Sequence, residues 1–502
     1  MKKLISIFLV VIVLFSGCVE KKTSVNYINS RNYPIYGVTD LPEDLTLLNN
    51  LNIRYNDILV NLFEGLVKKD IEGKVIPGLA KSWSVNKDNT VYTFKIRDDA
   101  NWSNGDKITA RDFVDFFSQI LSGNVNNIYD YQLFYIFGAE DYRKGKIDFN
   151  KTGIRSVDDE VLEIRLNVPC NYLLDILSSP IYGLRKLDNN LKTWVFNYDK
   201  IGFSGAYKIK HIKNEEIELE KNVYYWDKEN VISDKIVILD NKNTESSLAA
   251  FQSSKVDFIV SPPLSEIKAL RSKNFIMESS SHSGKVLTFN FSSDKVMNKE
   301  LRNAINNCID RKKICDDALD NTGEPWKYNI SDNKKAKGDE KSNYSSFKIL
   351  CLNDIKSKKV VEELKKELKT NLNIDLQIVF CENNEFIDKV KKNEYDMALM
   401  DFIMEYKNPI SYYEKFLSHN YFNFFSYKNR EYDNTIYKAK MEINETKQKE
   451  LFKKADKILI SDLPAIPLYI ERNIICKNEN IYDLEMNYNS NILLNKFYYS
   501  SK

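Results

Sequence analysis

The sequence predicts an α/β protein, and three observations point to this fold class. Residues 347–380 carry strand, helix and strand patterns in succession, which is the order of a βαβ unit with parallel strands. A strand pattern and a capped helix pattern also follow each other between residues 83 and 120. The chain has 502 residues, of which 43% are hydrophobic and 29% charged, so it is long enough for two or three hydrophobic cores.

The first predicted elements lie in the N-terminal third of the chain. Apolar and polar residues alternate over residues 91–97, which predicts a strand. A turn follows at residues 103–106, because its Asn-Gly pair adopts a positive φ at low cost. Thr109 is predicted to cap a helix, with Asp112 in the capping-box position. The inner face of this helix is apolar, with Phe113, Phe116, Phe117 and Ile120. Further strands are predicted at residues 161–168, 206–212 and 236–239.

The βαβ unit is predicted from three patterns in the second half of the chain. Residues 347–351 form an apolar strand pattern. The helix pattern is carried by Val360, Val361, Leu364 and Leu368. The second strand is predicted from strict alternation of Leu372, Ile374, Leu376, Ile378 and Phe380. A third buried strand is expected over residues 395–400.

Other elements flank this unit. An amphipathic helix is predicted over residues 298–309, and a polar loop over residues 331–345. A helix that includes Ala455, Ile458 and Leu459 precedes residues 463–469. Two prolines restrict the backbone of that segment, which suits a segment that crosses between two lobes.

Charge and histidine content argue against several classes of protein. Lys and Arg total 73 and Asp and Glu total 71, so there is no basic excess that a nucleic-acid partner would explain. The three histidines are far apart and lack the spacing of a zinc motif: His211, His282 and His419. No Gly-x-Ser-x-Gly, HExxH or Cys/His pairing is present. We therefore expect a protein without catalytic residues, cofactor or metal site.

The N-terminus has the features of a signal peptide. Lys2 and Lys3 precede an apolar run over residues 4–15, which is short for a membrane span. Phe15-Ser16-Gly17-Cys18 resembles the bacterial lipobox, so residues 1–17 are predicted to be removed and Cys18 to carry lipid. Residues 18–30 would then be a polar, lipidated tether. The expected location is extracytoplasmic, anchored to the outer face of the cytoplasmic membrane; a membrane-anchor helix is the alternative.

Six cysteines follow Cys18, and most of them are predicted to be buried thiols. None forms a CxxC motif, although an even number outside the cytoplasm permits disulfides.

Several motifs in consistent order resemble one known family. Residues 62–67, LFEGLV, and 73–83, GKVIPGLAKSW, are very similar to the start of family 5 extracellular solute-binding proteins. These are the oligopeptide, dipeptide and nickel receptors of ABC importers. The similarity continues at residues 92–97, 102–106, 109–113, 205–208, 222–226, 301–305, 395–398 and 464–469.

The resemblance implies a two-lobed, hinged fold of the periplasmic-binding-protein type II-like class, with an extra subdomain in lobe one. Lobe one would hold residues 31–279 and 469–502, with the extra subdomain at 51–174, and lobe two residues 280–468. The ligand would lie between the lobes. The implied function is to capture peptides and deliver them to ABC permease subunits and their ATPases. The chain would act as a monomer, held at the membrane by its lipid anchor.

The resemblance also implies ligand-binding residues. The segment after the strand at 395–400 places Glu405 where the family has the acid that binds the ligand's α-amino group; Asp401 is the rival. Asp401, Phe402 and Ile403 match the segment whose backbone pairs with the peptide as an added strand. Leu399 stands where the family can have a cation for the peptide carboxylate, so that clamp is not expected here.

Two loops of lobe one match segments near the ligand in the family. Residues 51–55, with Ile53 and Tyr55, match a loop that faces Glu405. Residues 203–207, with Ser204 and Gly205, match a turn near the cleft. For all these residues the alternative is an ordinary turn, a core contact or a surface carboxylate.

Three other functions stay open. The same fold could serve a peptide sensor that does not transport, or a receptor for nickel or a metal chelate. A peptidase is a third alternative, against which the missing catalytic motifs argue.

Overall fold

The structure of the chain, a computed structural model, describes residues 31–50, 52–326 and 346–500. The predicted signal peptide, the tether with Cys18, Leu51 and the predicted loop at 331–345 lie outside these residues. Tyr33–Ser500 belong to one unit. Among the described residues, no helix combines the length and apolar character needed to cross a membrane.

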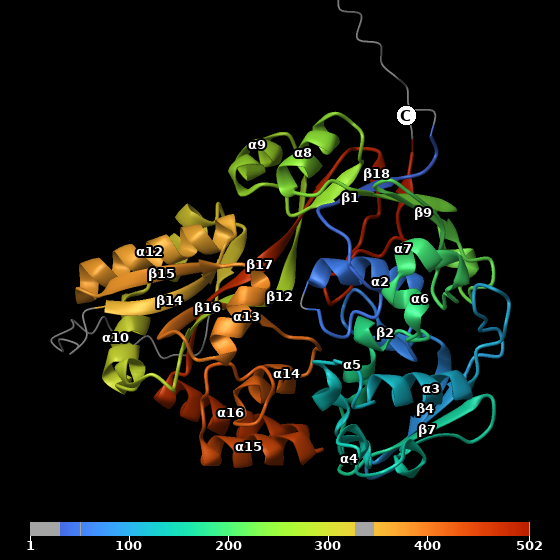
Figure 1. The fold of residues 1–502 in the computed structure, drawn as a ribbon, viewed down its shortest axis with the longest axis horizontal. Helices are drawn as coiled ribbons and strands as arrows, with labels where there is room; N and C mark the ends of the chain where they lie inside the picture. Colours follow the sequence, from blue (N-terminus) through green and yellow to red (C-terminus); the bar gives the residue numbers. More distant parts are fainter. Residues whose placement is uncertain (1–30, 51, 327–345, 501–502) are drawn as a thin grey trace, which may run out of the picture. The chain divides into compact units, whose positions relative to one another are not determined.

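An eleven-stranded sheet forms the centre of this unit, in the order β15-β14-β16-β12-β17-β11-β1-β10-β9-β8, with β13 paired to β17. In Figure 1 β14, β15 and β16 lie to one side of β12 and β17, and β1 and β9 lie to the other. The strands are β1 (Ile35–Val38), β8 (Tyr207–Lys213), β9 (Glu216–Lys221), β10 (Lys235–Asp240), β11 (Phe258–Val260), β12 (Ile276–Phe289), β13 (Gly323–Pro325), β14 (Ser346–Leu352), β15 (Asp375–Cys381), β16 (Met397–Ile403) and β17 (Ala465–Lys477).

The two long strands β12 and β17 connect the two sides of the sheet. They pair antiparallel from Ile276 and Cys476 at one end to Thr288 and Ala465 at the other. The register shifts between Ser280 and Gly284, so the ladder is interrupted near its middle. Most of the segment predicted at 463–469 therefore lies in β17, which begins at Ala465 and runs on to Lys477.

The predicted βαβ unit is confirmed. β14 and β15 pair parallel along their full lengths. α12 (Ile355–Leu372) connects them and is capped by Asp354, whose side chain accepts a hydrogen bond from the Ser357 N–H. The prediction that the second strand starts at Leu372 is wrong, because the helix continues to that residue. Leu372 is the last residue of α12, and Ile374 follows two residues later. Both pack on the same hydrophobic core, so their spacing resembles the alternation of a strand.

The predicted strand at 91–97 and the helix capped by Thr109 are confirmed, whereas the strand predicted at 161–168 ends at Arg165. β4 (Ala80–Val85), β5 (Val91–Ile96), β7 (Val161–Arg165) and β6 (Ile154–Ser156) form a second sheet against which α3 (Ala110–Ile120) packs. β4 and β6 were not predicted. The capping box at the start of α3 is present, with the Thr109 N–H donating to Asp112 at 2.8 Å. The four apolar residues predicted for its inner face are buried.

Five further helices lie on the side of the sheet that holds β14 to β16. They are α10 (Lys299–Cys308), α13 (Asn383–Lys391), α14 (Ile410–Tyr413), α15 (Arg430–Met441) and α16 (Glu445–Asp462). All six cysteines of the described residues are free thiols, and all but the partly exposed Cys308 are buried, which confirms the prediction for most of them.

Candidate functional site

A small cavity lies where β12 and the end of β16 meet loops from the two ends of the chain. Its volume is about 60 Å³, room for only a few water molecules. Residues before and within α2 (Asn56–Leu62) form one wall, together with the C-terminal segment around Ser490; Ile403 to Glu405 form another. The lining residues are Leu47, Asn50, Ile53, Asn56, Tyr129, Ser179, Pro180, Ile181, His282, Ser283, Ile403, Met404, Glu405, Asn489 and Ser490.

Three of the predicted site residues meet at this cavity: Ile53, Ile403 and Glu405. Asp401 is not among the lining residues. It lies opposite Lys285 on the neighbouring strand, and its carboxylate is 2.7 Å from the Lys285 ammonium. Phe402 is buried against Phe416, Tyr412 and other aromatic rings.

The other predicted lobe-one residues are engaged elsewhere. The Tyr55 hydroxyl donates to Asp40 at 2.6 Å. Ser204 is buried, donates to the Leu184 carbonyl at 2.7 Å and accepts from the Glu64 N–H at 3.1 Å. A Cβ on Gly205 would lie 2.6 Å from the Leu62 carbonyl carbon, so the turn packs directly on the backbone that ends α2.

The carboxylate of Glu405 forms an ion pair inside the chain. Its Oε1 is 2.6 Å from the Lys415 ammonium, and these side chains are only 9% and 6% exposed. Its Oε2 accepts from the Ser411 hydroxyl at 3.1 Å, and its backbone N–H donates to the same hydroxyl at 2.9 Å. The geometry and burial make this a charge-assisted, largely desolvated pair.

Aromatic rings and a second buried acid surround that pair. The Lys415 ammonium is 4.4 Å from the ring centroid of Phe422, which also contacts Tyr131 at 5.9 Å. Glu414 accepts from the Tyr406 hydroxyl at 2.6 Å and lies 3.4 Å from the Lys440 ammonium. Burial raises the pKa of Glu414 to about 8, with a smaller effect from the nearby charge of Glu405.

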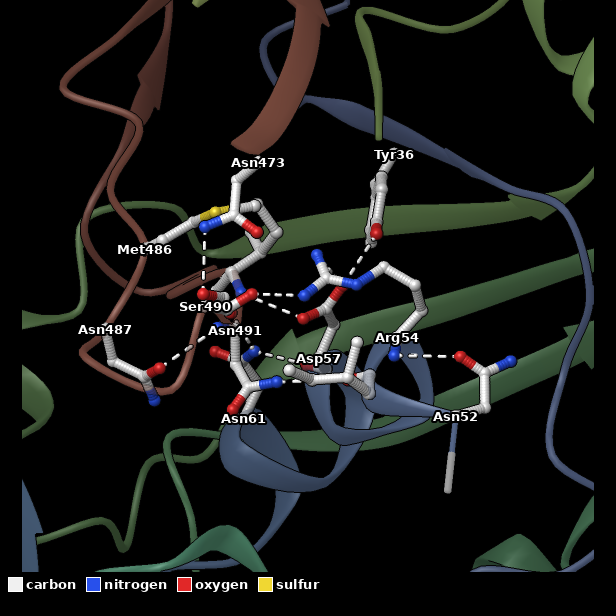
Figure 2. A network of polar contacts seen from close by, with 12 residues as sticks. Tyr36, Asn52, Arg54, Asp57, Asn61, Asn473, Met486, Asn487, Ser490 and Asn491 are labelled. Carbon is white, nitrogen blue, oxygen red and sulfur yellow. Dashed lines mark hydrogen bonds and ion pairs between the residues drawn. The ribbon is translucent and has the colours of Figure 1, made fainter. Parts of the chain in front are cut away.

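A buried polar network supports the cavity wall formed by the C-terminal segment (Figure 2). Asp57 at its centre accepts from the Tyr36 hydroxyl at 2.8 Å and from the Ile492 N–H at 2.9 Å. Arg54 lies 3.3 Å from Asp57 and donates to the Ser490 carbonyl. Asn473 of β17 donates to the Ser490 hydroxyl at 2.8 Å, so the network joins the long strand to the wall.

Several lining residues were missed by the sequence reasoning, among them Tyr129, His282, Asn489 and Ser490. Residues 487–491, Asn-Tyr-Asn-Ser-Asn, form a loop-type composition that could have marked an irregular segment. Nothing in that composition shows which residues it faces.

A larger hollow of about 540 Å³ is lined only by residues between Val60 and Asp227 and between Glu485 and Lys496. Several of its polar side chains contact one another. The Trp226 indole donates to Glu64 at 2.8 Å, Lys68 is 2.6 Å from Glu64, and the Arg97 guanidinium stacks on Trp226 at 3.4 Å. Of the predicted site residues only Gly205 lies there, so the smaller cavity is the better candidate site.

Two groups of elements joined by a pair of long strands, with a polar cavity beside the crossing, define a two-lobed binding protein of the periplasmic-binding-protein type II-like class. The profile of the bacterial extracellular solute-binding proteins, family 5 Middle, matches residues 74–349. The chain belongs to this family, which consists of solute-binding proteins rather than enzymes.

Relatives and solved structures agree with this assignment. The chain is 28% identical over 459 residues to the dipeptide-binding protein DppE of Bacillus subtilis, covering 84% of each chain. It is 28% identical over 464 residues to the oligopeptide-binding protein OppA of the same species, covering 84% of this chain and 85% of that protein. A crystal structure of a periplasmic oligopeptide-binding protein from Borrelia burgdorferi matches with a TM-score of 0.81 and 26% identity, covering 93% of this chain and 99% of that one. Haemophilus influenzae OppA in complex with the peptide RPPGFSPFR has the same fold, with a TM-score of 0.81 at 23% identity over 94% and 99% of the chains.

Proposed function

We propose that this protein is the peptide-capturing component of an ABC importer. The observation that carries the proposal is the cavity whose walls combine Ile53 and Ser490 from one side of the β12–β17 crossing with Ile403 and Glu405 from the other. A ligand held there would contact both sides at once. The names of the relatives, which describe dipeptide- and oligopeptide-binding proteins, support a peptide as that ligand.

The lobes proposed around this cavity are residues 31–279 with 469–502, and residues 280–468, with an extra subdomain at 51–174. The interrupted ladder between Ser280 and Gly284 supports a hinge at the first boundary. A cavity of about 60 Å³ is far below the roughly 300–1,000 Å³ of occupied ligand sites, which suits a closed form that must open to admit a peptide.

The proposed setting is extracytoplasmic, with Cys18 lipidated and the monomeric receptor delivering peptide to membrane-embedded permease subunits. Membership of an extracellular solute-binding family supports this location. Cys18→Ala should release the protein from membranes or leave the signal peptide uncleaved. A mature N-terminus other than an acylated Cys18 would contradict the anchor.

The binding function is tested by native mass spectrometry with an equimolar library of tri- to nonapeptides. Wild-type protein should retain peptides and should release them uncleaved, because a binding protein does not hydrolyse its ligand. Ile403→Trp overfills the cavity and should weaken binding by about 5- to 150-fold. Ile355→Trp, at an exposed position at the start of α12, is the matched control and should bind as wild type. Equal binding by both variants would contradict this site.

A further inference from the structure

Glu405, the one acidic residue among those that line the cavity, already has a cation of its own chain as partner. We infer that Lys415 takes the place of a ligand's amino group, so that the site accepts peptides with a blocked amino end as readily as peptides with a free one. This inference rests on the proposed peptide-binding function and specifies which peptides the site accepts.

The geometry leaves the carboxylate little need for a further cation. Lys415 lies 2.6 Å from Oε1 and the Ser411 hydroxyl 3.1 Å from Oε2, so each oxygen has a donor. Both charged side chains are less than a tenth exposed, so solvent screens their attraction poorly. Adding a ligand ammonium would place a second positive charge in the same desolvated space.

Displacing Lys415 is also unfavourable. Its ammonium lies 4.4 Å from the ring of Phe422 and 5.7 Å from that of Phe402. The adjacent acid, Glu414, is occupied by the Tyr406 hydroxyl at 2.6 Å and by Lys440 at 3.4 Å. A ligand amine that took Glu405 would therefore leave the Lys415 ammonium buried among rings without its carboxylate.

The rest of the wall offers neutral polar groups. Amide or hydroxyl side chains come from Asn50, Asn56, Ser179, Ser283, Asn489 and Ser490. Within the described part of the chain, no hydrogen-bond donor reaches the buried Oδ1 of Asn489. A peptide backbone N–H would satisfy this oxygen, so the wall can bind a peptide amide without a charged group.

The test measures by calorimetry how acetylation of the amino terminus changes affinity. Free and N-acetylated copies of the tri- to nonapeptide library are screened in parallel, and the best sequence from each is titrated in both forms. Wild-type protein should bind the two forms within about threefold of each other, because no ligand ammonium is paired. Lys415→Met frees the Glu405 carboxylate and should favour the free amine by at least about 30-fold.

Two further variants make the result specific. Lys415→Met combined with Glu405→Gln removes both charges and should return the ratio to near one. Lys449→Met removes an exposed lysine that pairs with exposed Glu445, and should leave the wild-type ratio unchanged.

The remaining outcomes would each contradict either the inference or the proposed function. A wild-type preference of 30-fold or more for the free amine would overturn the inference and leave the proposed function standing. If Lys415→Met does not fold, the wild-type titration by itself tests the inference. Equal binding of both forms by folded Lys415→Met would show that Lys415 does not control the preference. Failure of wild type to bind either library would overturn the proposed function, and the inference with it.

Discussion

Glu405 and Lys415 form a buried pair of opposite charges, so the effect of substituting either residue depends on the other. Removing one partner leaves the other buried without compensation, which costs far more than removing an exposed charge. The effect of a substitution at Glu405 is therefore a combination of folding and binding effects, and stability must be measured beside affinity.

Glu405→Gln should lower the free energy of unfolding by about 3–5 kcal/mol, because the Lys415 ammonium loses its counter-charge. Lys415→Met should lower it by a similar amount. The double variant should lose clearly less than the sum of the two, since both changes remove the same interaction. Urea denaturation of the four proteins measures this coupling.

The exposed pair of Glu445 and Lys449 provides the control, with a coupling below about 1 kcal/mol in the same cycle. Additive losses for Glu405 and Lys415 would show that the ion pair does not hold in solution.

Glu414 should make stability depend on pH. Burial raises its pKa from 4.5 to about 8, so between these values the folded protein holds a proton that the unfolded chain has lost. The contribution is fully present below pH 4.5 and is lost as pH rises to 8, at up to about 1.4 kcal/mol per pH unit. Glu414→Gln should remove this slope.

Urea denaturation of wild type and Glu414→Gln at several pH values checks the Glu414 prediction. Glu431→Gln, at an exposed position on α15, should retain the wild-type slope. Parallel wild-type and Glu414→Gln profiles would contradict the raised pKa of this carboxyl group.

For individual residues, the sequence predicted some of those that line the cavity but not the side chains with which they pair. The resemblance identified Ile53, Ile403 and Glu405, which do line the cavity. Lys415 lies ten residues beyond Glu405, and nothing in the linear pattern indicates that the chain between them folds back to form an ion pair. The roles of Glu405 and the other predicted site residues toward a ligand stay predictions.

Among the elements, those with strong local signals were the ones predicted correctly. The capping box of α3 and the apolar faces of α3 and α12 are local patterns, and each helix is present. No strand was predicted where β12 lies. It contains the run Ser279 to Ser283, which lacks strand-type alternation. Of this run, Ser279 and Ser280 pair with β17, and Ser283 pairs with Ile403 of β16.

The turn at Gly205 precedes β8 and packs against the end of α2. A substitution at Gly205 should show how much this packing stabilises the protein. Gly205→Ala places a Cβ within 2.6–2.8 Å of the backbone of Asn61, Leu62 and Phe63. We expect a loss of about 1–3 kcal/mol in the free energy of unfolding, because backbone cannot move aside as a side chain can. Thermal denaturation measures the loss.

Gly65→Ala is the comparison for this turn, since its nearest backbone atoms lie at 3.3 Å and it should lose less stability. If Gly205→Ala is as stable as wild type, the close packing of the turn on α2 does not hold.

For the whole molecule, patterns along the sequence predicted the βαβ unit, whereas the two-lobed arrangement came from the family resemblance. Strand order is set by pairing between distant segments, as where β1 lies between β10 and β11. Hydrophobic periodicity carries no information on such pairings.

Contacts across the proposed lobes indicate how closure is stabilised. The Lys407 ammonium donates to the Glu72 carbonyl at 3.0 Å and lies 5.7 Å from the ring centroid of Tyr488. Lys407→Met should weaken closure and give a larger radius of gyration without peptide, measured by small-angle scattering. Saturating peptide should restore the compact radius.

Lys438→Met, at an exposed position on α15, should scatter as wild type with and without peptide. A wild-type radius that does not change on saturation with a verified peptide would contradict the hinged mechanism.

The most direct test of peptide capture between the lobes is photo-crosslinking of a bound peptide that carries benzoylphenylalanine, with the attachment sites mapped by mass spectrometry. We predict crosslinks on both sides of the crossing, in residues 179–181 or 489–490 and in residues 403–405. Unlabelled peptide should compete with both sets. Crosslinks confined to the larger hollow beside Glu64 and Trp226, or to one lobe only, would contradict this site.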